Sequence, residues 1–186
     1  MPAPLNVAVI IGSLRKQSFN RAMAHELSKL APDSLALRIV EIDQLPLYNE
    51  DEEPRPPDSW VVFRRQIEVA DALLFLTPEY NRSVPAALKN ALDVSSRPYG
   101  HSVWDRKPGA VISVSVGALG GFGANHHLRQ ILVALNIPAM PQPEVYIGGA
   151  GALFDQSGHL TNQSTRALLG EFAHAFAGWA STYVDH

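Results

Sequence analysis

Three short segments of the chain carry most of the side chains that could bind a ligand. The first, Gly12 to Asn20, follows an apolar run and contains two serines, an asparagine and Arg15. Unpaired N–H groups at a helix N-terminus bind phosphate, and hydroxyl, amide and guanidinium donors favour the same dianion. The segment has neither a Walker Gly-Lys-Ser/Thr nor a dinucleotide Gly-x-Gly-x-x-Gly. It predicts a phosphate site of another type, with an ordinary serine N-cap beside a surface arginine as the alternative.

The other two segments offer an aromatic plate and a glycine-rich backbone. Thr77 to Pro85 contains Tyr80, an apolar ring with a polar tip, and Asn81, a residue type that tolerates unusual turn conformations. Ser115 to Gly123 contains four glycines, which let the backbone approach a ligand closely. Taken alone, each segment could also be an ordinary connection into a helix.

Alternating strands and helices must position these segments. Short apolar runs rich in Val and Ile indicate buried parallel strands, and helical spacing with caps indicates the helices between them. The predicted strands are 5–11, 36–42, 71–76, 109–116 and a weaker one within 139–147. The predicted helices are 18–30, 60–69, one that opens at 83–85 with Ser83 as N-cap and Pro85 in the first turn, 125–135 and 161–183.

This alternation predicts one α/β domain over residues 1–186, a three-layer sandwich around a five-stranded parallel sheet. Five strands favour the flavodoxin-like order 2-1-3-4-5, in which the first and third strands are neighbours. The three segments then leave the same edge of the sheet, where open α/β sheets bind ligands. Together they indicate a nucleotide-like ligand.

Composition excludes several other classes of protein. Hydrophobic residues make up 46% and charged residues 18%, which is typical of a compact globular chain. A net charge of −3 argues against nucleic-acid binding. The absence of cysteine excludes disulfides, thiol catalysis and cysteine-ligated metal. His126-His127 has no third ligand in view, so no metal site is expected.

The N-terminus and the segment 43–59 give two further expectations. Met1 to Pro4 leads into an apolar run that ends at Ile11, which is too short to span a membrane and lacks the cationic start of a signal peptide. We therefore expect a cytoplasmic protein without a membrane partner. The segment 43–59 is rich in Pro and acidic residues, and a loop of this length is either an interface element or a solvated charged loop.

Together, the three segments resemble the NADPH-dependent FMN reductase family, and most closely its bacterial quinone and chromate reductases. The resemblance rests on Gly-Ser-Leu-Arg-x-x-Ser-x-Asn, Pro-Glu-Tyr-Asn-x-Ser-x-Pro-x-x-Leu-Lys-Asn-x-x-Asp and Ser-x-Gly-x-x-Gly-Gly, and it extends over nearly the whole chain. Two positions depart from the family pattern. Val94 stands where relatives commonly carry an aromatic residue, and Phe122-Gly123 stands where they often carry a basic one.

The resemblance implies FMN as cofactor and assigns residues to it. The FMN phosphate would be held by Ser13, Arg15, Ser18, Phe19 and Asn20. The isoalloxazine ring would be bordered by Pro78, Glu79, Tyr80 and Asn81, with Ser115 and Gly117 on its other side.

The resemblance also implies an activity and an assembly. NADPH or NADH would pass hydride through N5 of FMN to a small acceptor such as a quinone, free flavin, an azo dye or chromate, so no side chain is expected as nucleophile or base. The acceptor and the choice between NADH and NADPH stay open. Relatives form homodimers, often paired into homotetramers, in which the acidic loop and the helix after Pro-Glu-Tyr-Asn make contacts.

Two other functions share this predicted fold. A flavodoxin-type electron carrier would bind FMN without turning over NAD(P)H, but such carriers tend to be strongly acidic and this chain is not. A phospho-receiver domain needs an acidic pair after the first strand and Asp after the third. Gly12-Ser13 and Thr77-Pro78 occupy those places, which argues against a receiver.

Overall fold

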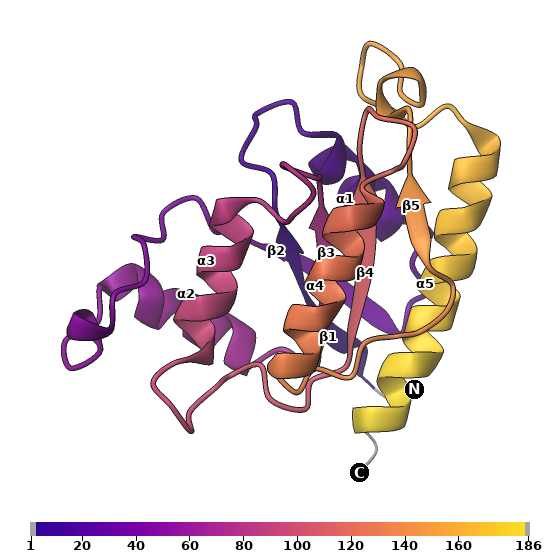
Figure 1. Cartoon of the computed structure of the whole chain (residues 1–186). Helices are drawn as coiled ribbons and strands as arrows, with labels where there is room; N and C mark the ends of the chain where they lie inside the picture. The colour runs from indigo at the N-terminus through magenta and orange to yellow at the C-terminus, as the bar shows by residue number, and fades with distance from the viewer. Residues whose placement is uncertain (1–2, 185–186) are drawn as a thin grey trace.

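The computed structural model describes residues 3–184 as an α/β fold around a five-stranded sheet (Figure 1). All strand pairs are parallel and the order is β2-β1-β3-β4-β5. In chain order the elements are β1 (Leu5–Ile11), α1 (Phe19–Leu30), β2 (Leu35–Val40), η1 (Glu50–Glu52), α2 (Asp58–Glu68), β3 (Ala72–Thr77), α3 (Ala86–Ser96), β4 (Gly109–Val114), α4 (Phe122–Ala134), β5 (Val145–Ile147), η2 (Ala150–Ala152) and α5 (Gln163–Val184). The predicted fold class and strand order are confirmed.

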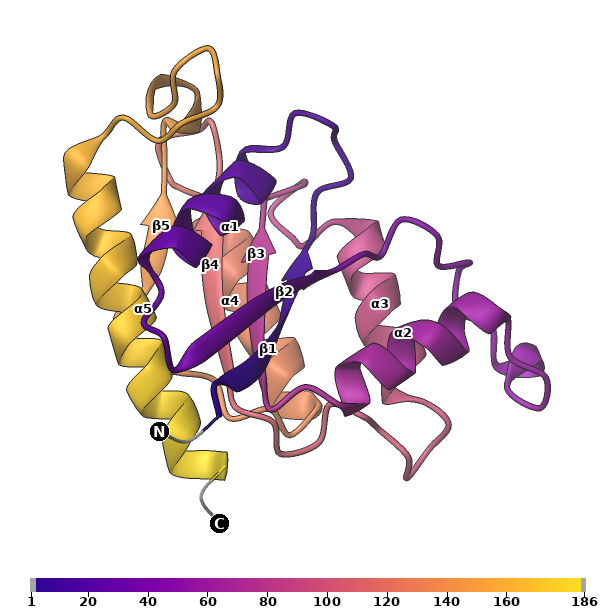
Figure 2. The same cartoon turned by 180° about the vertical axis from the view of Figure 1, so that it is seen from behind.

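Helices cover both faces of the sheet, which explains why its strands read as continuous apolar runs. In β1, Val7 and Val9 pack toward α1 and α5, whereas Ala8 and Ile10 pack toward α2, α3 and α4. Successive side chains of a strand point to opposite faces, so a strand that is buried on both sides is apolar at nearly every position. The exceptions in β3 and β4 are Thr77 and Ser113, which are both fully buried. Figure 2 shows α1 and α5 in front of the sheet, and Figure 1 shows α3 and α4 on the opposite side.

Two helix starts differ from the prediction. Ser83 does not cap α3, because its backbone pairs with Tyr80 in a tight turn and Pro85 takes the N-cap position. Helix α4 begins at Phe122 rather than at Asn125, because Gly121 adopts a left-handed φ of 77° that turns the chain into the helix. Ser18 does cap α1, since its hydroxyl accepts a hydrogen bond from the Arg21 N–H at 3.3 Å.

The segment 43–57 lies against α3 instead of extending freely. Asn90 of α3 accepts a hydrogen bond from the Tyr48 N–H at 2.7 Å, and its amide donates to the Pro46 carbonyl at 2.9 Å. The Trp60 indole donates to the same carbonyl at 3.2 Å. These contacts attach the acidic segment to the face of the sheet that carries α2 and α3.

None of the helices in residues 3–184 is long and apolar enough to cross a membrane. Met1 and Pro2, which begin the segment considered for a signal peptide, lie outside the described residues. The carboxyl ends of β1, β3 and β4 all point to the upper edge in Figure 1, and the loops that leave them meet there.

Candidate functional site

A cavity of about 140 Å³ lies at this edge of the sheet and brings the three predicted segments together. Its lining contains every predicted site residue except Asn81 and Gly117, and it adds two valines that the sequence did not single out. The lining residues are Ser13, Arg15, Ser18, Phe19, Asn20, Pro78, Glu79, Tyr80, Val114, Ser115 and Val116. Val114 and Val116 carried no signal of their own because they continue the apolar pattern of β4.

The first wall of the cavity is the loop between β1 and α1. The Gly12 N–H continues the sheet ladder by donating to the Leu76 carbonyl at 2.8 Å. A Cβ at Gly12 would lie 3.2 Å from Leu88 and 3.3 Å from Thr77, so the loop leaves the sheet closely packed. Ser13 and Ser18 are buried, whereas Arg15 is exposed at the mouth. The N-terminus of α1 therefore faces the cavity with hydroxyl groups inside and a cation outside.

Asn20 holds a free acceptor in this wall. The side chain is 3% exposed, and its amide nitrogen donates to the Val114 carbonyl at 3.2 Å. Its Oδ1 is buried without a hydrogen-bond partner among the described residues. An unpaired buried polar atom costs about 1–3 kcal/mol. This oxygen can only accept, so it fits a hydrogen-bond donor on a ligand.

The second wall is a tight turn after β3. The Tyr80 N–H donates to the Ser83 carbonyl at 2.9 Å and the Ser83 N–H donates back at 3.0 Å. Asn81 and Arg82 both adopt left-handed backbone, with φ of 51° and 65°, as a two-residue turn of this kind requires. The expectation of an unusual conformation at Asn81 is confirmed, and this residue lies outside the cavity lining. Tyr80 is 47% exposed at the mouth.

Glu79 faces helix α4 rather than open solvent. Its carboxylate Oε2 accepts a hydrogen bond from the Ala124 N–H at 3.1 Å, and Oε1 lies 3.2 Å from the Arg82 guanidinium. The partner at Ala124 is distant in the sequence, so no local pattern indicated this contact.

The third wall follows β4, and its glycines have a role other than the one predicted. Gly120 and Gly121 both have positive φ. A Cβ at Gly120 would lie 2.7 Å from the Tyr146 backbone, and one at Gly121 would lie 3.0 Å from Ser113. These glycines therefore permit close packing on β5 and β4, not close approach to a ligand. Gly117 remains available to a ligand, because a Cβ there would meet only Ser115.

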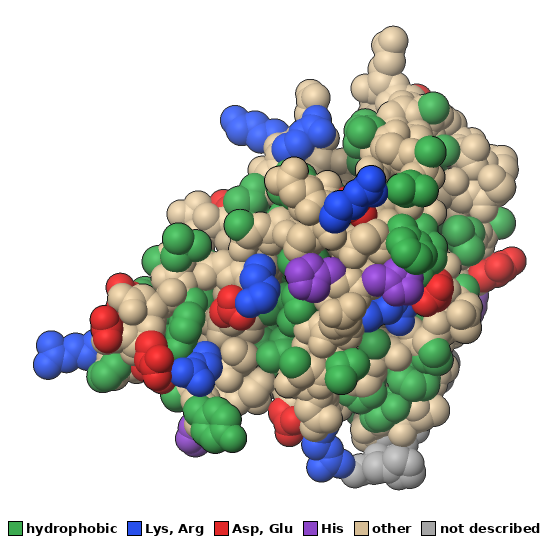
Figure 3. All heavy atoms as spheres, in the orientation of Figure 1, with side chains coloured by type: hydrophobic (Ala, Val, Ile, Leu, Met, Phe, Trp, Pro, Cys, Tyr) green, Lys and Arg blue, Asp and Glu red, His purple; other side chains and the backbone are tan. Residues whose placement is uncertain are grey.

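A second hollow, of about 640 Å³, continues from the cavity along α1, and sequence reasoning missed it. It runs between α1 and residues 154–159, and it shares Arg15, Ser18 and Phe19 with the cavity. Lys16 and His25 add further basic groups to its lining. Figure 3 shows Lys and Arg side chains at the upper edge of the molecule, where these loops lie. The basic groups favour an anionic ligand at this edge.

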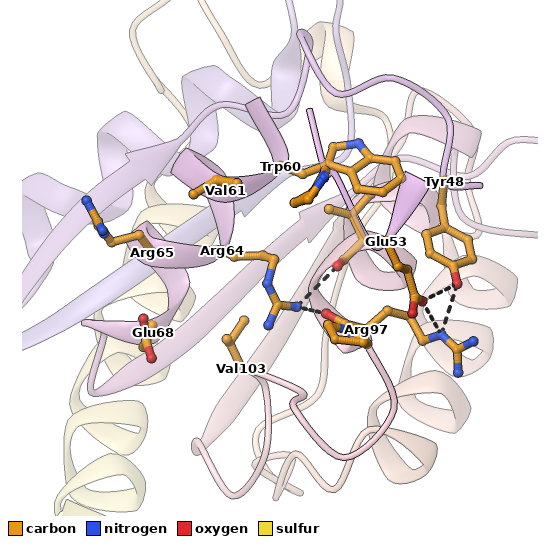
Figure 4. Close-up of a pocket in the computed structure, with 12 residues that line it drawn as sticks. Tyr48, Glu53, Trp60, Val61, Arg64, Arg65, Glu68, Arg97 and Val103 are labelled. Atoms are coloured by element: carbon orange, nitrogen blue, oxygen red, sulfur yellow. Dashed lines mark hydrogen bonds and ion pairs between the residues drawn. The ribbon is translucent and has the colours of Figure 1, made fainter. Parts of the chain in front are cut away.

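Another cavity, of about 220 Å³, lies away from the strand ends, and Arg64 and Arg97 in its lining are paired with groups of the chain (Figure 4). The Arg64 guanidinium donates to the carbonyls of Ser95 at 3.2 Å and His101 at 2.8 Å, and also to that of Arg97. Burial lowers the pKa of Arg64. The Arg97 Nε donates to the Tyr48 hydroxyl at 3.0 Å. These contacts close the C-terminal end of α3 and fasten the acidic segment to it.

The two neighbouring histidines each contact one polar side chain. His127 Nδ1 lies 2.8 Å from the Ser83 hydroxyl, and His126 Nε2 lies 3.0 Å from the Tyr146 hydroxyl. Burial raises the pKa of Tyr146 to about 12. Within residues 3–184, no three His, Asp or Glu side chains are grouped so that they could hold a metal ion.

Comparisons with known proteins agree with the arrangement of these loops. The family model described as NADPH-dependent FMN reductase matches residues 5–152. A quinone reductase of Pseudomonas putida is 62% identical over 175 residues, covering 94% of each chain. A 2-hydroxy-1,4-benzoquinone reductase of a Burkholderia species is 47% identical, covering 94% of this chain and 96% of its own.

A solved structure supports the same assignment. The flavoenzyme FerB, an NAD(P)H:acceptor oxidoreductase of Paracoccus denitrificans, superimposes with a TM-score of 0.90 at 38% identity. The match covers 96% of this chain and 98% of that one. The chain belongs to the NADPH-dependent FMN reductase family.

Proposed function

We propose that the protein binds FMN at the carboxyl edge of its sheet and uses it to transfer hydride from NADH or NADPH to a quinone. The family and the names of the two similar reductases support this proposal. The observation that carries it is the cavity itself, which combines a helix N-terminus, buried hydroxyls and one free buried acceptor.

The α1 end of the cavity suits the phosphate group. The buried hydroxyls of Ser13 and Ser18 and the first N–H groups of α1 can donate to its oxygens. Arg15 can pair with the dianion from the mouth, because it makes no ion pair with a carboxylate within residues 3–184.

Asn20 suits a different part of the cofactor. A phosphate dianion offers acceptors only, and the free Oδ1 of Asn20 needs a donor. The ribityl chain of FMN carries hydroxyl groups, which can donate. We therefore assign Asn20 Oδ1 to a ribityl hydroxyl, at the junction between the phosphate and the ring.

The ring would lie between the turn of Pro78 and Tyr80 on one side and the strand end at Ser115 on the other. Bound FMN would supply the hydride-accepting ring and the two-electron chemistry. The chain binds and orients it. The backbone at Gly117 is open to the ring on one side, because a Cβ there would meet only the Ser115 hydroxyl, at 3.6 Å. Backbone N–H groups that face a bound group stabilise negative charge that develops on it.

The mouth of the cavity favours an apolar acceptor. Each of the three loops carries a large apolar side chain that is at least 47% exposed. These side chains are Leu14, Tyr80, Val116 and Leu119. A flat apolar molecule such as a quinone gains from contact with such a rim, because burying apolar surface contributes about 25 cal/mol per Å². Chromate, free flavin and azo dyes remain acceptors to be compared with it.

We also propose that two copies of the chain form a dimer, or two dimers a tetramer, through α3 and the acidic segment. Asn90 and Arg97 hydrogen-bond to this segment, so it is held against α3 rather than being a free loop. The molar mass in solution tests this point.

The function is tested by loading the purified protein with FMN and following NADPH or NADH oxidation with a benzoquinone as acceptor. One nicotinamide oxidised for each quinone reduced supports the proposal. Failure to oxidise either nucleotide at full FMN occupancy contradicts it. If chemically reduced FMN in that protein still passes electrons to a redox protein, the flavodoxin-type carrier takes its place.

A further inference from the structure

Helix α4 begins without a cap of its own. Its N-cap residue, Gly121, has no side chain, and its first turn carries no acidic residue. The first N–H groups of a helix have no partner within the helix and need acceptors from elsewhere. A negative group is also favoured there by the helix dipole.

The packing of the chain explains why the cap cannot be local. Gly121 has a φ of 77°, and a Cβ at this position would lie 3.0 Å from the Ser113 Cβ. Serine or aspartate, the usual capping residues, would therefore be strained and crowded at position 121. The acceptor has to come from another part of the fold.

Glu79 supplies this acceptor from the loop after β3. Its Oε2 accepts from the Ala124 N–H at 3.1 Å, and its side chain is 13% exposed. Gly123 leaves the space that the carboxylate occupies, because a Cβ there would lie 3.0 Å from Oε2. The Arg82 guanidinium, 3.2 Å from Oε1, partners the other oxygen.

We propose that Glu79 is a positioning residue that fixes the width of the flavin cleft by fastening its second wall to its third. Pro78 and Tyr80 flank Glu79 in the second wall, and Gly121 joins α4 to the third wall at Ser115. The bond between Ser83 and His127, 2.8 Å long, adds a tie one helical turn further along α4. In relation to FMN, this inference rests on the proposed function.

The first test compares Glu79→Ala, Glu79→Gln and Asp155→Ala in the FMN-free protein by amide hydrogen exchange. Asp155 is a matched control, because its carboxylate accepts backbone N–H bonds from Ser157 and His159 away from α4. Glu79→Ala should speed exchange at Ala124 about fivefold, the usual effect of a lost cap oxygen. In Glu79→Gln the exchange rate at Ala124 should be closer to that of the unmodified protein, because an amide oxygen can still accept the hydrogen bond. Asp155→Ala should leave the exchange rate at Ala124 unchanged.

Glu79→Ala, Glu79→Gln and the unmodified protein are then titrated with FMN by flavin fluorescence. Because the cleft is loosened, the Kd of Glu79→Ala for FMN should be about fivefold higher than that of the unmodified protein. The Kd of Glu79→Gln should return toward the unmodified value. Unchanged exchange at Ala124 in Glu79→Ala overturns the inference, as does a Glu79→Gln variant as defective as Glu79→Ala. If the unmodified protein takes up no FMN, the proposed function fails, while the exchange result still decides whether the two loops are fastened.

Gly123→Ala gives a second test that leaves Glu79 in place. The added methyl group would displace the carboxylate and speed exchange at the start of α4. In the Glu79→Ala background the same change should have a smaller effect, because no carboxylate is left to displace. The contact with the Arg82 carbonyl, at 3.2 Å, is present in both backgrounds and cancels when the two effects are compared. Effects that simply add in the double variant overturn the inference.

Discussion

Replacing Asn20 by alanine is expected to weaken FMN binding while leaving the stability of the FMN-free protein almost unchanged. The side chain makes one hydrogen bond, from its amide nitrogen to Val114, and leaves Oδ1 buried and unpaired. Losing the bond lowers the free energy of unfolding by about 0.5–1.5 kcal/mol, and removing the unpaired oxygen raises it by about 1–3 kcal/mol. The two effects offset each other within about 1 kcal/mol, or roughly 3 °C in Tm.

FMN binding should respond differently, because the proposed ribityl hydroxyl loses its acceptor. The loss of one such hydrogen bond is about 1 kcal/mol, which raises Kd about fivefold. The matched control is Asn125, a second buried asparagine whose atoms all have partners. Its amide nitrogen donates to Ser113 and Val145, and its oxygen accepts from Arg129 at 3.0 Å. Asn125→Ala should lower Tm by roughly 10 °C and leave FMN affinity unchanged in the folded protein.

Both variants are measured by thermal unfolding without FMN and by fluorescence titration with FMN at a temperature where each is folded. The reasoning is refuted if Asn20→Ala lowers Tm as far as Asn125→Ala does while binding FMN with unchanged affinity. That result would mean that Oδ1 of Asn20 already has a partner in the FMN-free protein.

Three further changes give separate expectations. Arg15→Ala should raise the Kd for FMN about tenfold, as for a charge-assisted bond to phosphate, with an unchanged rate per bound flavin in stopped-flow reduction; a large loss of rate at full occupancy would contradict this. The hydrogen bond from Lys29, with the nearby Arg166, lowers the pKa of Glu26 below 4.5. The ion pair therefore stabilises the fold when the pH is above the pKa of Glu26, and this stabilisation is lost as pH falls through the lowered pKa. Glu26→Gln should flatten the acid side of a plot of Tm against pH. An unaltered acid side would refute the assignment. Arg64→Met should lower the free energy of unfolding by about 2–4 kcal/mol in a urea titration, because several carbonyls at the end of α3 lose their donor, while FMN affinity stays the same; a weaker affinity would link this distant cavity to the cleft.

Much of the fold could be predicted because its strands are buried on both faces. A run such as Leu5 to Ile11 is apolar except at Asn6 and ends at Gly12, so its type and its limits are visible locally. The start of α1 was equally visible, since Ser18 caps it directly. The starts of α3 and α4 were not, because they depend on the Tyr80–Ser83 turn and on the packing of Gly121 against β4.

The candidate site could be predicted as a set of loops but not as a set of contacts. The loop from Gly12 to Asn20 and the Pro-Glu-Tyr-Asn turn are each continuous in sequence, and the strand order alone brings them together. The contact between Glu79 and Ala124 and the unpaired oxygen of Asn20 depend on atoms from strands and helices far apart in the chain. The hollow along α1 was missed for the same reason, since residues 154–159 form its other side.

The central claim is that this cleft holds FMN and takes hydride from a nicotinamide nucleotide. The most direct measurement is the absorbance spectrum of the FMN-loaded protein without oxygen, recorded before and after NADPH or NADH and again after a benzoquinone. The account predicts flavin bands that bleach with the nucleotide and return with the quinone. Bands that persist with both nucleotides at full FMN occupancy, or a protein that takes up no FMN, would contradict it.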